Sequence, residues 1–183
     1  MELKEVIAKR RSIRKYLPIK VEKNLIEEIL YQGTLAPSAK NGQPWRFIVI
    51  DKEIKLKEKI ADFMIQKAEE RISEGLQGES IINTVNIMKQ APVLVLIFNI
   101  YEGHYLGPNI QSIGACIENM CLAATDLGLG SLWIANTDYA KQEIEDLFPE
   151  QNGELLAALS LGYSDQEPEA RPRKKVEEIT IWR

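Results

Sequence analysis

Apolar residues recur every three or four positions in five stretches of this chain, and this spacing places them on one face of a helix. The predicted helices cover residues 2–10, 21–35, 53–72, 109–127 and 138–148. The fourth of these is apolar on nearly all sides, unlike the others. Such a helix needs cover on several sides, which we expect from its own sheet and from a second copy of the chain.

Short runs of β-branched, aromatic and aliphatic residues predict the strands of that sheet. The expected strands cover residues 45–50, 93–98, 131–135 and 155–161, with a further strand at 176–182. Residues 93–98 are continuously apolar, which is typical of a strand that is buried on both faces. Residues 73–90 are left unassigned. The mixed order of helices and strands predicts an α+β or α/β fold.

The length of 183 residues predicts one domain that spans residues 1–183. Lysine and arginine number 23 and acidic residues 27, and the net charge of -4 lacks the basic excess that drives nonspecific binding to nucleic acid. No apolar stretch approaches the roughly 20 residues needed to cross a bilayer, and the charged N-terminus does not resemble a signal peptide. We therefore expect a cytoplasmic protein that binds neither a membrane nor nucleic acid.

The cysteines and the histidine do not form a metal-binding pattern. Cys116 and Cys121 are five positions apart on a predicted helix, about 140° around its axis, so they cannot easily share a disulfide or a metal ion. His104 is the one histidine, and no Cys-x-x-Cys or His-x-x-x-His spacing occurs. We therefore expect no bound metal ion.

Two basic clusters stand out in this acidic chain. Residues 9–15 contain five cations and a serine but no acid, directly after the first predicted helix, and residues 171–175 contain four cations beside a proline. Arginine suits phosphate because its planar guanidinium forms paired hydrogen bonds. The alternatives are a solvated basic face that stabilises the helix end, a basic arm for nucleic acid or acidic partners, and a solvated linker. Two arginine clusters far apart in sequence could also converge on one phosphate.

The loop at 36–44 offers a different chemistry. Ser38, Asn41 and Gln43 carry hydroxyl and amide groups that both donate and accept hydrogen bonds, as the edge of a heteroaromatic ring requires. Pro37 and Pro44 restrict the backbone and so reduce the entropy lost on binding. The alternative is an ordinary turn, in which the serine and the asparagine bond their own backbone.

Other catalytic patterns are weak. Residues 128–133 contain two glycines but follow a helix and end in Trp133, so they are a poor dinucleotide-binding fingerprint. These glycines serve equally well to cap the helix or to let the backbone approach a ligand. Glu118 and Asp126 interrupt the apolar helix, and we attribute them to capping and structural hydrogen bonds. No catalytic nucleophile is expected, because no Gly-x-Ser-x-Gly occurs and neither thiol has a polar setting.

Together these motifs resemble those of the nitroreductase family of flavin-dependent oxidoreductases. The resemblance rests on RRSIR at residues 10–14, APSAKNGQPW at 36–45, GLGSLWI at 128–134, and LSLGY at 159–163 followed by RPRK at 171–174. It implies an α+β fold with a mostly antiparallel central sheet flanked by helices. It also implies an intertwined homodimer that binds FMN in two clefts at its interface.

The resemblance further implies which residues bind the cofactor. Arginines from both ends of the chain, with one serine, would hold the FMN phosphate, ribityl chain and pyrimidine edge: Arg10, Arg11, Ser12, Arg14, Arg171 and Arg173. Loop residues, contributed by the other subunit, would contact the ring system and ribityl hydroxyls: Pro37, Ser38, Ala39, Asn41 and Gln43. The backbone near the flavin N5 and O4 would be that of Leu132, Trp133 and Ile134.

The implied reaction is hydride transfer, whose chemistry belongs to the flavin. NADH or NADPH would reduce FMN at N5 and leave, and a nitroaromatic or quinone would then accept hydride on the same face with ping-pong kinetics. No catalytic side chain is needed, although Arg14 or Arg10 would stabilise the anionic reduced flavin. The alternatives are another acceptor, such as an enone, a flavin or a halogenated aromatic, and a non-enzymatic FMN sensor. Tyr101, His104 and Tyr105 are candidates for lining the acceptor cleft.

Overall fold

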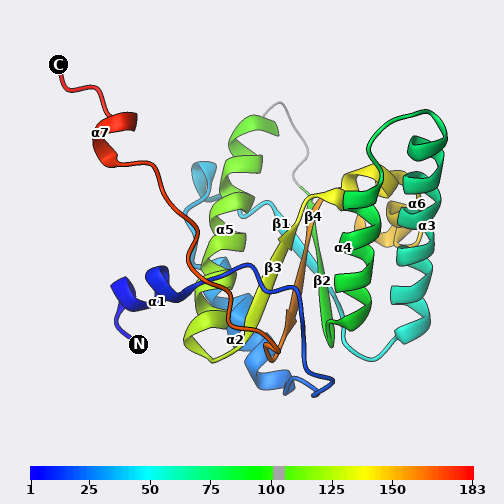
Figure 1. Cartoon of the computed structure of the whole chain (residues 1–183), viewed down its shortest axis with the longest axis horizontal. Coiled ribbons are helices and arrows are strands. Elements are labelled where there is room, and N and C mark those ends of the chain that lie inside the picture. The colour runs from blue at the N-terminus through cyan, green and yellow to red at the C-terminus, as the bar shows by residue number, and fades with distance from the viewer. Residues whose placement is uncertain (101–105) are drawn as a thin grey trace.

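Four antiparallel strands form the central sheet of this computed structural model, which describes residues 1–100 and 106–183. The strands are β1 Trp45–Ile50, β2 Val93–Asn99, β3 Gly130–Ile134 and β4 Glu154–Gly162. They lie in the order β1-β2-β4-β3, and each neighbouring pair is antiparallel. The fold is therefore α+β, with helices on both faces of the sheet (Figure 1). The candidate cleft residues Tyr101, His104 and Tyr105 lie outside the described part of the chain.

The central strand β2 supplies side chains to two separate cores. Val93, Val95 and Ile97 belong to one apolar cluster, and the alternating residues between them belong to another. Every residue of β2 is buried, so the prediction of a strand covered on both faces is confirmed. The reason is the two-residue period of a strand, which divides a continuous apolar run between the two faces of the sheet.

One face is covered by α2 Lys23–Thr34 and α5 Leu106–Asp126, with α1 Leu3–Lys9 packed against α5 (Figure 1). Helices α2 and α5 approach closely at Gly33, where an added Cβ would lie 2.6 Å from Cγ of Met120. Helix α5 is followed by Gly128 in the left-handed region (φ 77°), and Leu129 N–H donates to the Ala124 carbonyl at 2.7 Å. Helix capping, one of the two roles that the sequence offered for this glycine, is therefore present.

The other face is covered by α3 Ile54–Ser73 and α4 Glu79–Gln90 (Figure 1). Helix α4 occupies most of the stretch left unassigned by the sequence, and the glycines at 75 and 78 separate it from α3. The prediction of one continuous helix over residues 138–148 is wrong. A 3₁₀ turn, η2 Asn136–Ala140, leads into a shorter helix, α6 Lys141–Glu145. Two further 3₁₀ turns are η1 Ala39–Asn41, before β1, and η3 Pro149–Gln151, before β4. No helix in the described ranges has the length and apolar character needed to span a membrane.

The two ends of the chain run beside each other after α1 and after β4. Tyr16 forms an antiparallel bridge with Ser164, Leu17 N–H donates to the Tyr163 carbonyl at 2.9 Å, and Asp165 N–H donates to the Lys15 carbonyl at 3.0 Å. Earlier in the same segment, Ser12 forms a parallel bridge with Ser131 of β3. These backbone contacts align two segments that are about 150 residues apart in sequence.

The strand expected at 176–182 is wrong. The segment contains one helical turn, α7 Val176–Ile179, on a tail that leads away from the sheet (Figure 1). A strand needs a neighbour for its backbone hydrogen bonds, and no described segment of this chain lies alongside the tail as a ladder partner. Its last apolar residues stay exposed, with Trp182 at 88%.

Candidate functional site

The chain becomes extended where α1 ends, and this change places the first basic cluster. Arg10 follows the last turn of α1 with φ −52° and ψ 131°. Ile13 is buried, and its N–H donates to the Ser131 carbonyl at 2.9 Å. The close approach requires Gly130, because a Cβ there would lie 2.8 Å from Cγ1 of Ile13. Side chains alternate along extended backbone, so Ser12 and Arg14 face away from the buried isoleucine.

Residues from both ends of the chain line one cavity of about 160 Å³, which we call the arginine cavity. Its walls are formed by Arg10, Arg11, Ser12, Arg14, Pro168, Glu169, Arg171 and Arg173. The structure thus brings together the six residues that the sequence analysis assigned to the FMN phosphate, ribityl chain and pyrimidine edge. The pairing of residues 15–17 with 163–165 explains this convergence, because it holds both basic segments near the same edge of the sheet.

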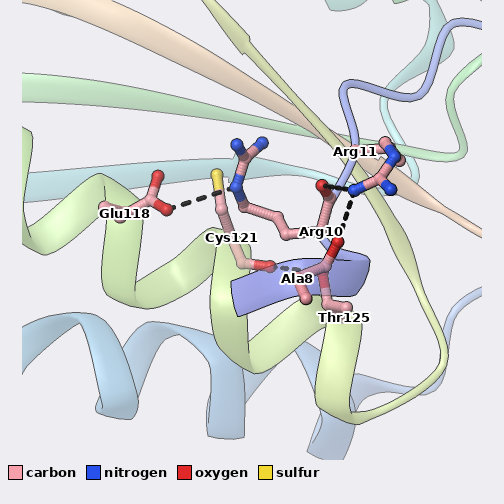
Figure 2. A network of polar contacts seen from close by, with 6 residues as sticks. All are labelled: Ala8, Arg10, Arg11, Glu118, Cys121 and Thr125. Carbon is pink, nitrogen blue, oxygen red and sulfur yellow. Dashed lines mark hydrogen bonds and ion pairs between the residues drawn. The ribbon is translucent and has the colours of Figure 1, made fainter. Parts of the chain in front are cut away.

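Most of the positive charge in this cavity is not neutralised by the protein. Nε of Arg10 pairs with Glu118 Oε1 at 3.2 Å (Figure 2). Within residues 1–100 and 106–183, the other four arginines form no ion pair, and Arg14 and Arg173 donate only to backbone carbonyls. A cluster of guanidinium groups with few acidic partners is suited to an anion such as a phosphate.

Arg11 has both a structural role and an unsatisfied donor. Its Nη1 donates to the carbonyls of Ala8 and Arg10, at 2.6 and 2.8 Å, so it does stabilise the end of α1 as the alternative interpretation proposed (Figure 2). Its Nε is buried and has no acceptor in the described part of the chain. A buried donor without an acceptor costs about 1–3 kcal/mol, so an anion or water bound here would remove that cost.

The loop at 36–44 is ordered, but it lies apart from the arginine cavity. Its backbone contains three non-glycine residues in the left-handed region, Lys40, Asn41 and Gln43. Ala39 N–H donates to Ser112 Oγ on α5 at 3.2 Å, and Gln43 N–H donates to Ser38 Oγ at 3.1 Å. The second of these bonds is the self-satisfied turn that the sequence offered as an alternative. Strained backbone of this kind persists only where the surroundings hold it, and it is common at functional sites.

The five loop residues expected in the cofactor site do not line the arginine cavity of the same chain. These residues are Pro37, Ser38, Ala39, Asn41 and Gln43. Each is partly or fully exposed. The structure therefore leaves them accessible to another molecule and does not join them to the arginines.

Strand β3 lies at the edge of the sheet, so the backbone on its outer side is available to a ligand, whereas most of its side chains are buried. Leu132 and Ile134 are buried in the core beneath α3 and α4, whereas Trp133 is 44% exposed. The Ser131 carbonyl points to the outer edge of β3, where it accepts from Ile13, and the backbone of Trp133 faces the same side two residues on. At that edge, the backbone of Trp133 has no hydrogen-bond partner within the described ranges. Trp133 lies about 7 Å along the strand from Ser131, since each residue of a strand advances about 3.3 Å.

Two features of the site were not found from the sequence. Pro168 and Glu169 line the cavity, and Glu118 contacts Arg10. The one available signal was that Glu118 is a charged residue on an otherwise apolar face. Asp126, on the same helix, pairs with the amino group of Met1 instead. The described residues contain no group of three or more side chains that could hold a metal ion.

Comparisons with known proteins give the same fold and family. A protein from Archaeoglobus fulgidus, provisionally named an NADH dehydrogenase/NAD(P)H nitroreductase, is 30% identical over 170 residues, which cover 91% of this chain and 87% of the relative. A solved structure of a BluB-like flavoprotein from Clostridium difficile is 33% identical, with a TM-score of 0.85 over 100% of this chain and 99% of the other.

A second solved structure is a complex with FMN from Desulfovibrio desulfuricans. It is 25% identical, with a TM-score of 0.79 over 100% of this chain and 97% of the other. The model of the Nitroreductase family matches residues 7–163, which include β1 to β4 and the first basic cluster. The chain therefore belongs to the nitroreductase family.

Proposed function

We propose that this protein is an FMN-dependent oxidoreductase that passes hydride from NADH or NADPH to an electrophilic organic acceptor. The observation that carries the proposal is the arginine cavity, where five guanidinium groups from both ends of the chain meet. Glu169 is the one acid in its wall, and within the described residues Arg10 alone of the five arginines forms an ion pair. The FMN phosphate is an anion of the kind that such a cluster binds. The FMN complex of the Desulfovibrio desulfuricans protein and the name of the Archaeoglobus fulgidus relative support it.

The protein's own residues bind and orient the cofactor in this proposal. Arg11, Arg171 and Arg173 hold the phosphate, and the buried Nε of Arg11 gains an acceptor. Arg14 is exposed and donates only to the Ser12 carbonyl, so its guanidinium can reach the pyrimidine end and stabilise negative charge there. The backbone of Trp133, which has no hydrogen-bond partner at the outer edge of β3 among the described residues, would contact the flavin ring system. When bound, FMN supplies the hydride chemistry at N5.

A second copy of the chain completes the site in this proposal. The arginine cavity of about 160 Å³ is smaller than the roughly 300–1,000 Å³ of pockets that enclose cofactor-sized ligands. The loop residues from Pro37 to Gln43 lie elsewhere in the same chain, and they would reach the flavin from a partner. Exposed apolar residues on α1 and on the tail, such as Leu3, Ile7 and Trp182, offer surface for a homodimer.

The acceptor that we propose is a nitroaromatic compound, as the family name suggests, or a quinone. An enone, a flavin or a halogenated aromatic would accept hydride from the same reduced cofactor, so one assay covers them all. Donor and acceptor would use the same face of FMN in turn. Ping-pong kinetics, seen as parallel double-reciprocal plots, are the expected consequence.

The test is the absorbance spectrum of the purified protein, followed by anaerobic addition of NADH or NADPH. Flavin bands that bleach with the nicotinamide and return with an acceptor would support the proposal, and a panel of acceptors would rank them by rate. FMN that binds but is not bleached would favour the non-enzymatic sensor. A preparation that contains no flavin and binds none would contradict the proposal, and sedimentation of the same sample tests the dimer.

A further inference from the structure

Arg10 differs from the other arginines of the cavity because a carboxylate holds it. Its Nε lies 3.2 Å from Oε1 of Glu118 on α5, and the two side chains are 25% and 46% exposed. No described residue accepts a hydrogen bond from the terminal nitrogens of the Arg10 guanidinium, which extend beyond this contact (Figure 2). One edge of the guanidinium is thus fixed, and the other is available to a ligand.

A second neighbour of Arg10, the thiol of Cys121, is not charged at neutral pH. The sulfur of Cys121 lies beside the guanidinium (Figure 2). Burial raises the pKa of the Cys121 thiol to about 11, although its hydrogen bond with Ser131 opposes this. The thiol therefore stays protonated at neutral pH and does not compete with Glu118 for the guanidinium. Glu118 is the one described residue that forms an ion pair with Arg10.

We propose that Glu118 is a positioning residue for the phosphate of FMN. It holds Arg10 in the wall of the arginine cavity through Nε and leaves the two terminal nitrogens free for the phosphate. This inference rests on the proposed function, because it requires FMN to occupy the cavity. Prior fixation of a long, flexible side chain reduces the entropy that is lost when a ligand binds.

Two effects of Glu118 on FMN binding have opposite signs, and this makes the inference testable. As a negative charge close to the phosphate, the carboxylate repels it, so removal of the charge would tighten binding. As a support for Arg10, the carboxylate aids binding, so removal of the support would weaken it. The inference states that the support is the larger effect.

The experiment measures dissociation constants of FMN and riboflavin for apoprotein variants by flavin fluorescence. Glu118→Ala should weaken FMN binding by roughly two- to tenfold, the range expected for loss of one preordered side chain. It should leave riboflavin binding unchanged, because riboflavin lacks the phosphate. Glu118→Gln keeps the reach and an acceptor oxygen without the charge, so it should bind FMN at least as tightly as the parent. Glu118→Asp keeps the charge but is too short, so it should resemble Glu118→Ala.

The control is Asp126→Ala, since Asp126 lies on the same helix, has the same 46% exposure and also pairs with a cation. It does not line the arginine cavity, so FMN binding should not change. In an Arg10→Ala background, Glu118→Ala should no longer weaken FMN binding, because only the repulsion is left to remove, and binding should become slightly tighter.

Three results would overturn the inference. Tighter FMN binding by Glu118→Ala would show that repulsion dominates, and an equal loss for FMN and riboflavin would show that Glu118 does not act through the phosphate. An unchanged effect of Glu118→Ala in the Arg10→Ala background would show that it does not act through Arg10. These failures leave the proposed function intact if the parent binds FMN, whereas a parent that binds no flavin overturns both.

Discussion

The α3–α4 side of the sheet and the side that carries α1, α5 and the arginine cavity differ in how fully one chain completes them. Beneath α3 and α4, large side chains such as Phe98 and Met64 are fully buried, and the surface pair Lys67–Glu143 joins α3 to α6. On the other side, apolar residues of α1 and the tail are exposed, and four arginines lack carboxylate partners among the described residues. The first side provides stability within the chain, and the second is the surface on which a ligand and a partner would act.

Phe98→Ala should produce the largest effect, on stability alone. Phe98 is fully buried and meets Phe148 edge to face, with ring centroids 6.3 Å apart. Loss of this ring should lower the free energy of unfolding by about 3–5 kcal/mol, measured by guanidinium denaturation of the apoprotein. The control Ile54→Ala, at an exposed position of α3, should cost less than about 0.5 kcal/mol. A large loss of FMN affinity in folded Phe98→Ala would contradict the separation of the two sides.

Arg14→Ala and Arg173→Ala should show the opposite behaviour. Hydrogen bonds to a charged group contribute about 1.5–3 kcal/mol, so each variant should raise the dissociation constant of FMN roughly tenfold or more. The free energy of unfolding of the apoprotein should change little, because both guanidinium groups donate only to nearby carbonyls. Arg46→Ala, an exposed arginine on β1, is the matched control and should leave FMN binding unchanged. Unaltered FMN affinity in both arginine variants would contradict the proposed cofactor site.

The side that carries the arginine cavity also contains two buried thiols, Cys116 and Cys121 of α5. Burial raises the pKa of Cys116 to about 12 and of Cys121 to about 11. The folded state therefore keeps both protons where the unfolded state releases them, so stability is complete below about pH 9 and decreases as pH rises toward 11. The slope is on the order of 1.4 kcal/mol per pH unit for each thiol.

Chemical denaturation at pH 7, 9 and 10.5 measures this slope. A Cys116→Ala/Cys121→Ala variant should be less stable at pH 7, because it loses buried atoms, but its stability should fall less steeply with pH. Parallel pH dependences for the parent and the variant would show that these thiols do not ionise differently in the two states.

Glu143→Gln should produce the smallest effect, a slight loss of stability on the α3–α4 side of the sheet. Lys67 holds the pKa of the Glu143 carboxyl below its usual value, mainly through their hydrogen bond. A lowered pKa in the folded state means that the pair stabilises the protein above the usual pKa of glutamate, about 4.3, and that this is lost as pH falls further. The variant should melt slightly below the parent at pH 7 and together with it at pH 3. A difference that persisted at pH 3 would point to packing instead of charge.

Local patterns in the sequence predicted most elements of this fold. The alternation along β2 and the helical spacing in α2, α3 and α5 are set by neighbours a few residues away, so they can be read without the tertiary structure. The predictions of a helix at 138–148 and of a strand at 176–182 were wrong because these segments depend on contacts that a local pattern does not specify. A short amphipathic pattern does not decide between a 3₁₀ and an α turn, and an apolar tail becomes a strand only beside another strand.

What the sequence alone determined is the chemistry of this protein: two arginine clusters suited to phosphate, a proline-bounded polar loop, and apolar runs of strand and helix period. Only the tertiary structure decided which of these groups meet. Residues 15–17 pair with 163–165, so the arginines share one cavity, and Glu118 reaches Arg10 from a helix more than 100 positions away. Side-chain types are written in the sequence, whereas contacts between distant segments depend on strand register and on the direction in which each side chain leaves the backbone.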